Sequence, residues 1–275
     1  MKTAEEILET NKKQREFYNH QTRQNLATRL WACLRNGLLN RTRKAVGIQE
    51  EVYETHRRWI GDIATKKVLD LGCFAGNYWS IYLAENAKSY LGIDLSDVGI
   101  GRLNARLTHF PNAEARVVDF LSPEFFDTDF DLIYAYGVLH HFPNTDLLIA
   151  RLQEKLAPGG EIIAYDPLET SVPLKLLRSL YRPFQSDAEW EWPFSRKTFR
   201  KYRDGFDLIE HHGILGRAKW VALLGFLPLS QESKVRMGRR WHRYDWEMSG
   251  VSDRALFACM HLTMRLRKKQ SRTLP

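Results

Sequence analysis

The spacing of apolar and polar positions changes twice along this chain. In residues 1–65, apolar side chains recur every three or four residues and no proline intervenes, which predicts helices. We expect these helices over Thr3–Tyr18, Thr22–Leu39 and Gly47–Ile60. From residue 66 short apolar runs replace this pattern, and after Asp166 the regular alternation stops.

Residues 66–166 predict strands that alternate with helices. The expected strands are the short apolar runs Lys67–Leu71, Ser89–Ile93, Ala115–Asp119, Asp131–Tyr136 and Glu161–Tyr165. Helical spacing occupies three of the intervals, at Tyr78–Glu85, Ser96–Thr108 and Asn144–Leu156. Short apolar strands alternating with helices of this length are typical of an α/β fold with a parallel, doubly wound sheet.

The last hundred residues read as additions to that sheet. Four prolines punctuate an aromatic, basic stretch, which predicts a cap over residues 167–194, inserted after the fifth strand. We expect a helix at Ser195–Tyr202, with Ser195 as its N-cap, and a strand at Phe206–His211. The apolar runs Ala218–Leu229 and Leu256–Leu266 are interpreted as the last strands and a buried helix.

Composition favours a cytoplasmic globular protein. Of the 275 residues, 44% are hydrophobic and 27% charged, and no apolar run approaches the length of a membrane span. The polar N-terminus lacks the apolar stretch of a signal peptide. Three scattered cysteines (Cys33, Cys73 and Cys259) indicate neither a disulfide framework nor a metal cluster.

The net charge of +8 belongs to the flanks of the chain. Residues 66–169 carry 8 Lys/Arg against 15 Asp/Glu, whereas residues 1–65 carry 12 against 8 and residues 170–275 carry 21 against 10. Such flanks fit solvated helices, attraction to an anionic membrane or acidic substrate, or nucleic acid. In a peripheral membrane contact, the alternative for the apolar runs Ala218–Leu229 and Leu256–Leu266, both runs would lie at the bilayer surface. Arg265, Arg267, Lys268 and Lys269 of the basic C-terminal region would then face anionic headgroups.

The strongest chemical signal is the segment VLDLGCFAG at Val68–Gly76. An apolar run there ends in an acidic residue and a glycine turn, where glycine lets the backbone approach a ligand closely. A second run, Ser89–Asp94, ends in another acid 24 positions after Asp70. Together they predict the opening β-α-β unit of a nucleoside-binding sheet, with the second carboxylate on a ribose. Phe74 in the turn is expected to keep an ordinary φ, with its ring over the cofactor or over the methyl-transfer face.

The chain resembles class I S-adenosylmethionine-dependent methyltransferases in four segments that occur in the family's order. These are VLDLGCFAG, LGIDLS, ARVVDF, and FDLIYAYGVLHHF followed by LAPGGEIIAYD. The similarity is strongest to the small-molecule branch that includes ubiquinone-biosynthesis methyltransferases, and it covers residues 66–169 well and 195–215 loosely. It implies a mostly parallel, seven-stranded Rossmann-like sheet in a methyltransferase domain at 66–275. The helical extension would be residues 1–65, and the cofactor would be S-adenosylmethionine.

The resemblance also assigns residues to the cofactor. Asp70 would hold its amino group, Asp94 the ribose hydroxyls, Leu95 and Phe120 the adenine surroundings, and Asp119 the exocyclic amine. The full predicted cofactor-binding set is Asp70, Gly72, Cys73, Gly76, Asp94, Leu95, Asp119, Phe120, Tyr136 and Gly137. Cys73 is interpreted as a small packing residue, because methyl transfer needs no enzyme thiol.

An oxygen acceptor would also need a base, and histidine suits neutral pH. His141 is the first candidate and His140 the second; His211 and His212 are expected to lie further from the methyl group. No metal site is predicted, since Asp127, Asp129 and Asp131 read as a solvated turn.

Residues 1–65 and 167–275, outside the predicted alternating strands and helices, hold seven of the eight tryptophans and many arginines, which favours a small amphiphilic or aromatic acceptor. O-methylation is favoured, with nitrogen and carbon as open alternatives. The rival functions are an RNA methyltransferase, a nicotinamide-dependent oxidoreductase and a catalytically silent methyltransferase-fold binding protein. Nucleic acid is not favoured, because no RNA-binding module is recognisable. The oligomeric state stays open.

Overall fold

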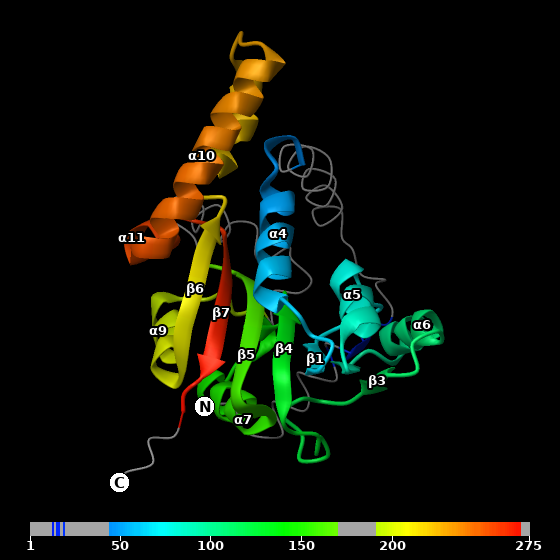
Figure 1. The fold of residues 1–275 in the computed structure, drawn as a ribbon. Coiled ribbons are helices and arrows are strands. Elements are labelled where there is room, and N and C mark those ends of the chain that lie inside the picture. The colour runs from blue at the N-terminus through cyan, green and yellow to red at the C-terminus, as the bar shows by residue number, and fades with distance from the viewer. Residues whose placement is uncertain (1–12, 14, 17–18, 20–43, 170–190, 271–275) are drawn as a thin grey trace.

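The computed structural model describes residues 13, 15–16, 19, 44–169 and 191–270 (Figure 1). Most of the helices expected at Thr3–Tyr18 and Thr22–Leu39, and most of the cap expected at 167–194, lie outside these residues. The third helix expected near the N-terminus is present as α4 (Ile48–Ile60). The two ends of the cap lie together, because Leu168 and Phe194 form a parallel bridge.

The predicted seven-stranded, mostly parallel sheet is confirmed. Its strand order is β3-β2-β1-β4-β5-β7-β6, and only β7 runs antiparallel to its neighbours. The strands are β1 (Lys67–Leu71), β2 (Ser89–Asp94), β3 (Ala113–Val117), β4 (Phe130–Tyr136), β5 (Leu156–Pro167), β6 (Phe206–Ile214) and β7 (His261–Lys268). The four strands β2, β1, β4 and β5 pair in parallel, so their carboxyl ends share one edge.

Helices cover both faces of the sheet. On one face, α4, α5 (Tyr78–Asn86) and α6 (Asp97–Leu107) bury Trp59, Trp79 and Leu103. On the other, α7 (Thr145–Lys155) and α9 (Arg196–Gly205) bury Leu152 and Phe199. The central strands β1, β2 and β4 are consequently buried on both sides, which explains their continuous hydrophobic runs.

Side-chain caps fix where these helices begin. Asn77 makes a reciprocal capping box with Ser80 at the start of α5. Ser96, Asn144 and Ser195 each accept a hydrogen bond from a backbone N–H in the first turn of α6, α7 and α9. The predicted N-cap role of Ser195 is confirmed. The first turns of α5 and α6 are therefore held next to the ends of β1 and β2.

Some predicted boundaries were wrong. The strand expected at Ala115–Asp119 is β3, which ends at Val117, so Asp119 lies in the following loop. The strand expected at Glu161–Tyr165 is the core of the longer β5.

The C-terminal part differs most from expectation. Ala218–Leu229 is not a strand: its first nine residues form the 3-10 helix η4 (Ala218–Phe226). It is followed by α10 (Gln231–Val251), which was not predicted, and by the short α11 (Asp253–Leu256). α10 packs on β6 and η4 and extends beyond the sheet (Figure 1). In the part of the chain that the structure describes, every helix is too short or too polar to span a bilayer.

Candidate active site

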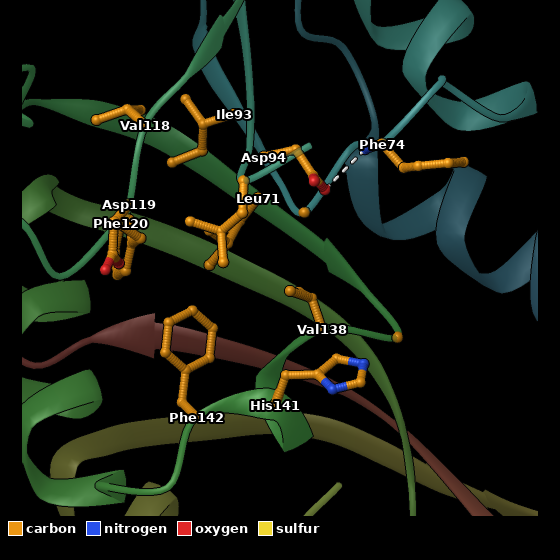
Figure 2. Close-up of a pocket in the computed structure, with 13 residues that line it drawn as sticks. Leu71, Phe74, Ile93, Asp94, Val118, Asp119, Phe120, Val138, His141 and Phe142 are labelled. Carbon is orange, nitrogen blue, oxygen red and sulfur yellow. Dashed lines mark hydrogen bonds between the residues drawn. The ribbon is translucent and has the colours of Figure 1, made fainter. Parts of the chain in front are cut away.

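A cavity of about 320 Å³ opens at the shared carboxyl edge of β1, β2 and β4. Figure 2 shows its walls, which come from the ends of these strands, the loop after β3 and the 3-10 helix η2 (Leu139–His141). The lining residues are Leu71, Gly72, Phe74, Ile93, Asp94, Leu95, Val118, Asp119, Phe120, Gly137, Val138, His141 and Phe142. Ligands of parallel α/β sheets bind at this edge.

The glycine turn after β1 brings two backbone segments together. Gly72 and Gly76 have φ values of 72° and 76°, which side-chain-bearing residues seldom adopt. A Cβ on Gly72 would lie 2.4 Å from Cγ2 of Val138, so the turn can approach the end of β4 only without a side chain. The turn thus forms a thin wall of the cavity.

We predict that Gly72→Ala lowers the free energy of unfolding by roughly 2–4 kcal/mol, because it adds backbone strain and a contact with Val138. Gly101→Ala is the matched control, since Gly101 lies inside α6 and a Cβ there would meet nothing within 4 Å. We expect that control to be unchanged or about 1 kcal/mol more stable. Urea unfolding of the two variants measures both values, and equal stabilities would refute the close approach.

The expectation of an ordinary backbone at Phe74 was wrong. Its φ is 45°, in the left-handed region that costs a non-glycine residue about 1–2 kcal/mol. Two contacts offset this strain. The Phe74 N–H donates to Asp94 at 3.0 Å, and the Phe74 ring packs on Gly99, where a Cβ would lie 2.7 Å from Cδ2. The ring therefore points toward the start of α6 (Figure 2).

Asp94 ends β2 and presents its carboxylate to the cavity. One oxygen accepts the Phe74 N–H, and the other accepts the Ser96 N–H at 2.8 Å. Burial raises the pKa of this carboxyl above its usual value, and the backbone hydrogen bonds oppose that shift. A carboxylate offers about four lone-pair sites, so positions remain for the two hydroxyls of a ribose. The geometry fits the sugar of a nucleoside.

Three further predicted cofactor residues line the neighbouring wall. Leu95 follows Asp94, and Asp119 and Phe120 come from the loop after β3. One Asp119 oxygen accepts the Leu121 N–H at 2.9 Å, which fixes the turn of this loop. The wall joins an apolar side chain, a carboxylate and an aromatic ring, the groups expected around an adenine. Gly137, with a φ of 74°, lines the cavity at the end of β4.

Asp70, Cys73, Gly76 and Tyr136 do not line the cavity. The strand alternation explains Asp70: Leu71 faces the cavity, so the preceding side chain points to the opposite face of the sheet. There the Tyr90 hydroxyl donates to Asp70 at 2.8 Å. Cys73 is buried in the cluster of Trp79 and Tyr90, as a packing residue would be. The role of Asp70 toward the cofactor stays a prediction.

Burial raises the pKa of Asp70 to about 6, against hydrogen bonds from Ser80 and Tyr90 that lower it. Between about pH 4 and pH 6 the unfolded chain therefore releases this proton while the folded chain retains it. The contribution of Asp70 to the free energy of unfolding therefore falls as pH rises across that window, by up to about 3 kcal/mol.

Asp70→Asn removes this titration. We predict that the stability of the variant relative to the unmodified chain increases from pH 4 to pH 7, as measured by urea unfolding at each pH. The contributions of the other titratable groups cancel in this difference. Glu85→Gln, at an exposed position, is the control and should show little change. A flat difference for Asp70→Asn would mean that the carboxyl titrates normally.

The two candidate bases occupy different environments. His141 lines the cavity, whereas His140 is buried and its Nδ1 lies 2.8 Å from Asp166 Oδ1. The backbone N–H of His140 donates to the same oxygen at 3.1 Å. The rings of His140 and His141 are tilted by 37° with centroids 4.0 Å apart. His140 is thus placed to hold η2 and the His141 ring rather than to touch a ligand in the cavity. His211 and His212 lie on β6, outside the lining.

The sequence did not predict five apolar lining residues: Leu71, Ile93, Val118, Val138 and Phe142. Leu71 and Ile93 are signalled by position, because each ends or nearly ends a strand beside a predicted ligand residue. Val138 and Phe142 flank the histidine pair, and only the geometry of η2 brings both to the cavity wall (Figure 2).

The Rossmann-like sheet and the cavity at its carboxyl edge are typical of enzymes that bind a nucleoside cofactor. Residues 18–210 match the family described as "Methyltransferase domain". The chain belongs to this methyltransferase family, whose members use S-adenosylmethionine. The predicted family, the enzyme class and the cofactor are thereby confirmed.

Two curated relatives are similar over part of their length. The tRNA U34 carboxymethyltransferase of Nautilia profundicola is 33% identical over 107 residues, which cover 37% of this chain and 34% of that protein. The ubiquinone biosynthesis O-methyltransferase of Acinetobacter baumannii is 31% identical over 106 residues, covering 37% and 44%. The matched segments thus span less than half the length of these relatives.

Among solved structures, the N-methyltransferase NodS from Bradyrhizobium japonicum, in complex with S-adenosyl-L-homocysteine, has a TM-score of 0.51 at 17% identity. The match covers 81% of this chain and 87% of that one. At this identity the likeness establishes the fold.

Proposed function

We propose that this protein transfers the methyl group of S-adenosylmethionine to a small amphiphilic or aromatic acceptor, with oxygen as the favoured acceptor atom. When bound, the cofactor supplies an electrophilic methyl group on a sulfonium. The chain itself holds the nucleoside, orients the acceptor and accepts its proton.

Asp94 is the observation that carries the proposal. Its carboxylate stands at the end of β2, inside a cavity bounded by a glycine turn, and each oxygen already accepts one backbone N–H. Leu95 and Asp119 line the same wall. Such a site suits the adenosyl group of the cofactor, with the sulfur attached to that group lying toward the turn after β1.

Oxygen is favoured because His141 lines the opposite part of the cavity. In this role the imidazole would take the proton of an acceptor hydroxyl as the oxygen attacks the methyl group. The acidic side chains of the cavity, Asp94 and Asp119, are committed to the nucleoside in this proposal. One curated relative, from A. baumannii, is named an O-methyltransferase, which adds support.

An apolar part of the acceptor is supported by the wall next to His141. Val138 and Phe142 flank the imidazole there and offer carbon surface rather than hydrogen-bonding groups (Figure 2). An acceptor with an apolar body and one ionisable hydroxyl matches that combination. Alignment and exclusion of water would then supply much of the rate.

Isothermal titration calorimetry with S-adenosylhomocysteine and with NADH tests the cofactor part. We expect micromolar binding of S-adenosylhomocysteine and affinity for NADH at least about a hundredfold weaker. Tighter binding of NADH would favour the oxidoreductase reading. If neither compound binds, the protein would be a catalytically silent binding protein with the methyltransferase fold.

The acceptor part is tested in a producing cell. Methylated lipids, quinones and secondary metabolites are compared before and after the protein is depleted, and labelled methyl donor then identifies the acceptor in extracts. We expect one amphiphilic product to disappear. Label that enters RNA instead would replace the small-molecule proposal by an RNA methyltransferase.

A further inference from the structure

Residues 217–251, which include η4 and α10, form a projection at the cavity end of the sheet. β5 and β6 both pair antiparallel with β7, so they run in the same direction. The chain therefore leaves β6 for η4 at the edge where the cavity opens. In Figure 1 α10 extends outward from this edge.

Three-residue periodicity divides η4 into an inner and an outer side. Ala218, Val221 and Leu224 recur every third residue and are buried in a cluster with Trp246 of α10. Trp220 and Leu223 point outward and are 41% and 54% exposed. Two further leucines in the turn to α10, Leu227 and Leu229, are 47% and 39% exposed. Large apolar side chains thus gather on the outside of the projection.

The projection is also basic. Residues 217–251 carry seven Lys/Arg against three Asp/Glu, a net charge of +4, and all seven basic residues lie within 217–243. Arg236, Arg239, Arg240 and Arg243 are exposed, and their three- and four-residue spacing puts them on one face of α10. None of these four makes an ion pair with a carboxylate of the described residues.

The apolar and basic groups adjoin. Arg236, Arg240, Tyr244 and Met248 follow one another at four-residue intervals along α10, so the arginine face continues into exposed Tyr244 and Met248. Trp220 of η4 borders the same groove as these two residues. The surface therefore places guanidinium groups next to side chains that prefer an apolar phase.

The basic C-terminal strand offers no such surface. Arg265 and Arg267 both pair with Glu161, and Lys268 donates to the Leu156 carbonyl at 2.6 Å. Leu262, Met264 and Leu266 of the same strand are buried in the sheet. Of the two apolar runs considered for a membrane contact, Leu256–Leu266 is therefore buried in the fold, and only Ala218–Leu229, in the projection, has exposed apolar side chains.

We propose that the projection docks on an anionic bilayer surface, with Trp220 and Leu223 in the interface and the α10 arginines on lipid phosphates. Charge complementarity identifies the partner as anionic, and the exposed apolar side chains favour a bilayer over RNA, which presents no apolar phase. The proposal goes beyond methyl transfer. It also brings the cavity edge of the sheet toward a phase in which amphiphilic acceptors dissolve.

Flotation of the full chain with vesicles tests this inference. We expect it to float with vesicles of phosphatidylcholine and phosphatidylglycerol at low salt, and to remain in solution with pure phosphatidylcholine vesicles. Moderate salt should weaken binding, because the arginine contribution is screened. The absence of flotation with anionic vesicles at low salt would overturn the proposal.

Two variants locate the surface. R236Q/R239Q/R240Q should lower the partition coefficient at least about tenfold, since each basic residue near the surface contributes. W220S/L223S should lower it at moderate salt, where apolar contacts dominate. K88Q/R102Q/K197Q removes three exposed charges from other helices and loops, and should bind as the unmodified chain does. Equal loss in this control and in the α10 variant would refute a specific docking surface.

The outcome is independent of the proposed function. S-adenosylhomocysteine titration of the same variants reports whether the cavity is intact, and we expect unchanged affinity. Direct binding of a mixed-sequence RNA that the α10 variant loses, together with no flotation of the unmodified chain, would assign the projection to nucleic acid. Failure of cofactor binding with normal flotation would overturn only the methyltransferase proposal.

Discussion

Replacing Asp94 by alanine is expected to weaken S-adenosylhomocysteine binding by roughly a hundredfold or more. Hydrogen bonds to a charged acceptor contribute about 1.5–3 kcal/mol each, and two ribose hydroxyls would lose their partner. The turn would lose order as well, because the Phe74 and Ser96 N–H groups both donate to this carboxylate. Isothermal titration calorimetry measures the affinity directly.

Two controls separate this loss from unfolding. Asp62→Ala removes an exposed carboxylate before β1, at the opposite end of that strand from the cavity, and should leave the affinity within about twofold. Asp94→Asn keeps the shape but only one acceptor oxygen, so one of the Phe74 and Ser96 N–H groups loses its partner. We expect this variant to fold with a lower thermal midpoint and to bind more weakly, and circular dichroism at the temperature of the titration confirms that it is folded. An Asp94→Ala variant that is folded and binds normally would remove the ribose assignment.

His141→Gln is expected to lower kcat by about 10²- to 10³-fold, since a positioned general base contributes rate factors of this size. S-adenosylhomocysteine affinity should change less than about threefold, because the imidazole is assigned to the acceptor and not to the nucleoside. The assay uses labelled methyl donor and the acceptor that extract screening identifies.

His109→Gln is the matched control, as His109 is exposed in the loop between α6 and β3 and remote from the cavity lining. It should retain full turnover. A pH profile adds a second readout: loss of the base should remove an ionisation from the acidic limb of kcat. Unchanged kcat in His141→Gln would show that the acceptor needs no base from this residue.

The sheet was predictable because its signals are local and redundant. The central strands β1, β2 and β4 are short apolar runs, and α5 and α6, which follow β1 and β2, begin at the side-chain caps Asn77 and Ser96. Asp94 could be found because an acid ending the second strand has few other purposes in such a fold. Gly72 could be found because a strand must turn sharply there.

The structural features that the sequence did not predict depend on contacts between segments that are distant in the chain. α10 was missed because aromatic and basic residues occur around its circumference, and its inner face is defined only by η4 and β6. Phe74 adopts a left-handed φ because Asp94 and Gly99 hold it, which no local pattern encodes. The histidine pair could not be resolved either, since the buried carboxyl of Asp166 selects which ring turns away from the cavity.

A crystal structure with S-adenosylhomocysteine bound would show whether Asp94 holds the ribose. We expect both ribose hydroxyls within hydrogen-bond distance of the Asp94 carboxylate, the adenine beside Leu95 and Asp119, and the sulfur on the side of His141. A nucleoside bound elsewhere in the molecule, or a ribose in the cavity without contact to Asp94, would contradict this expectation.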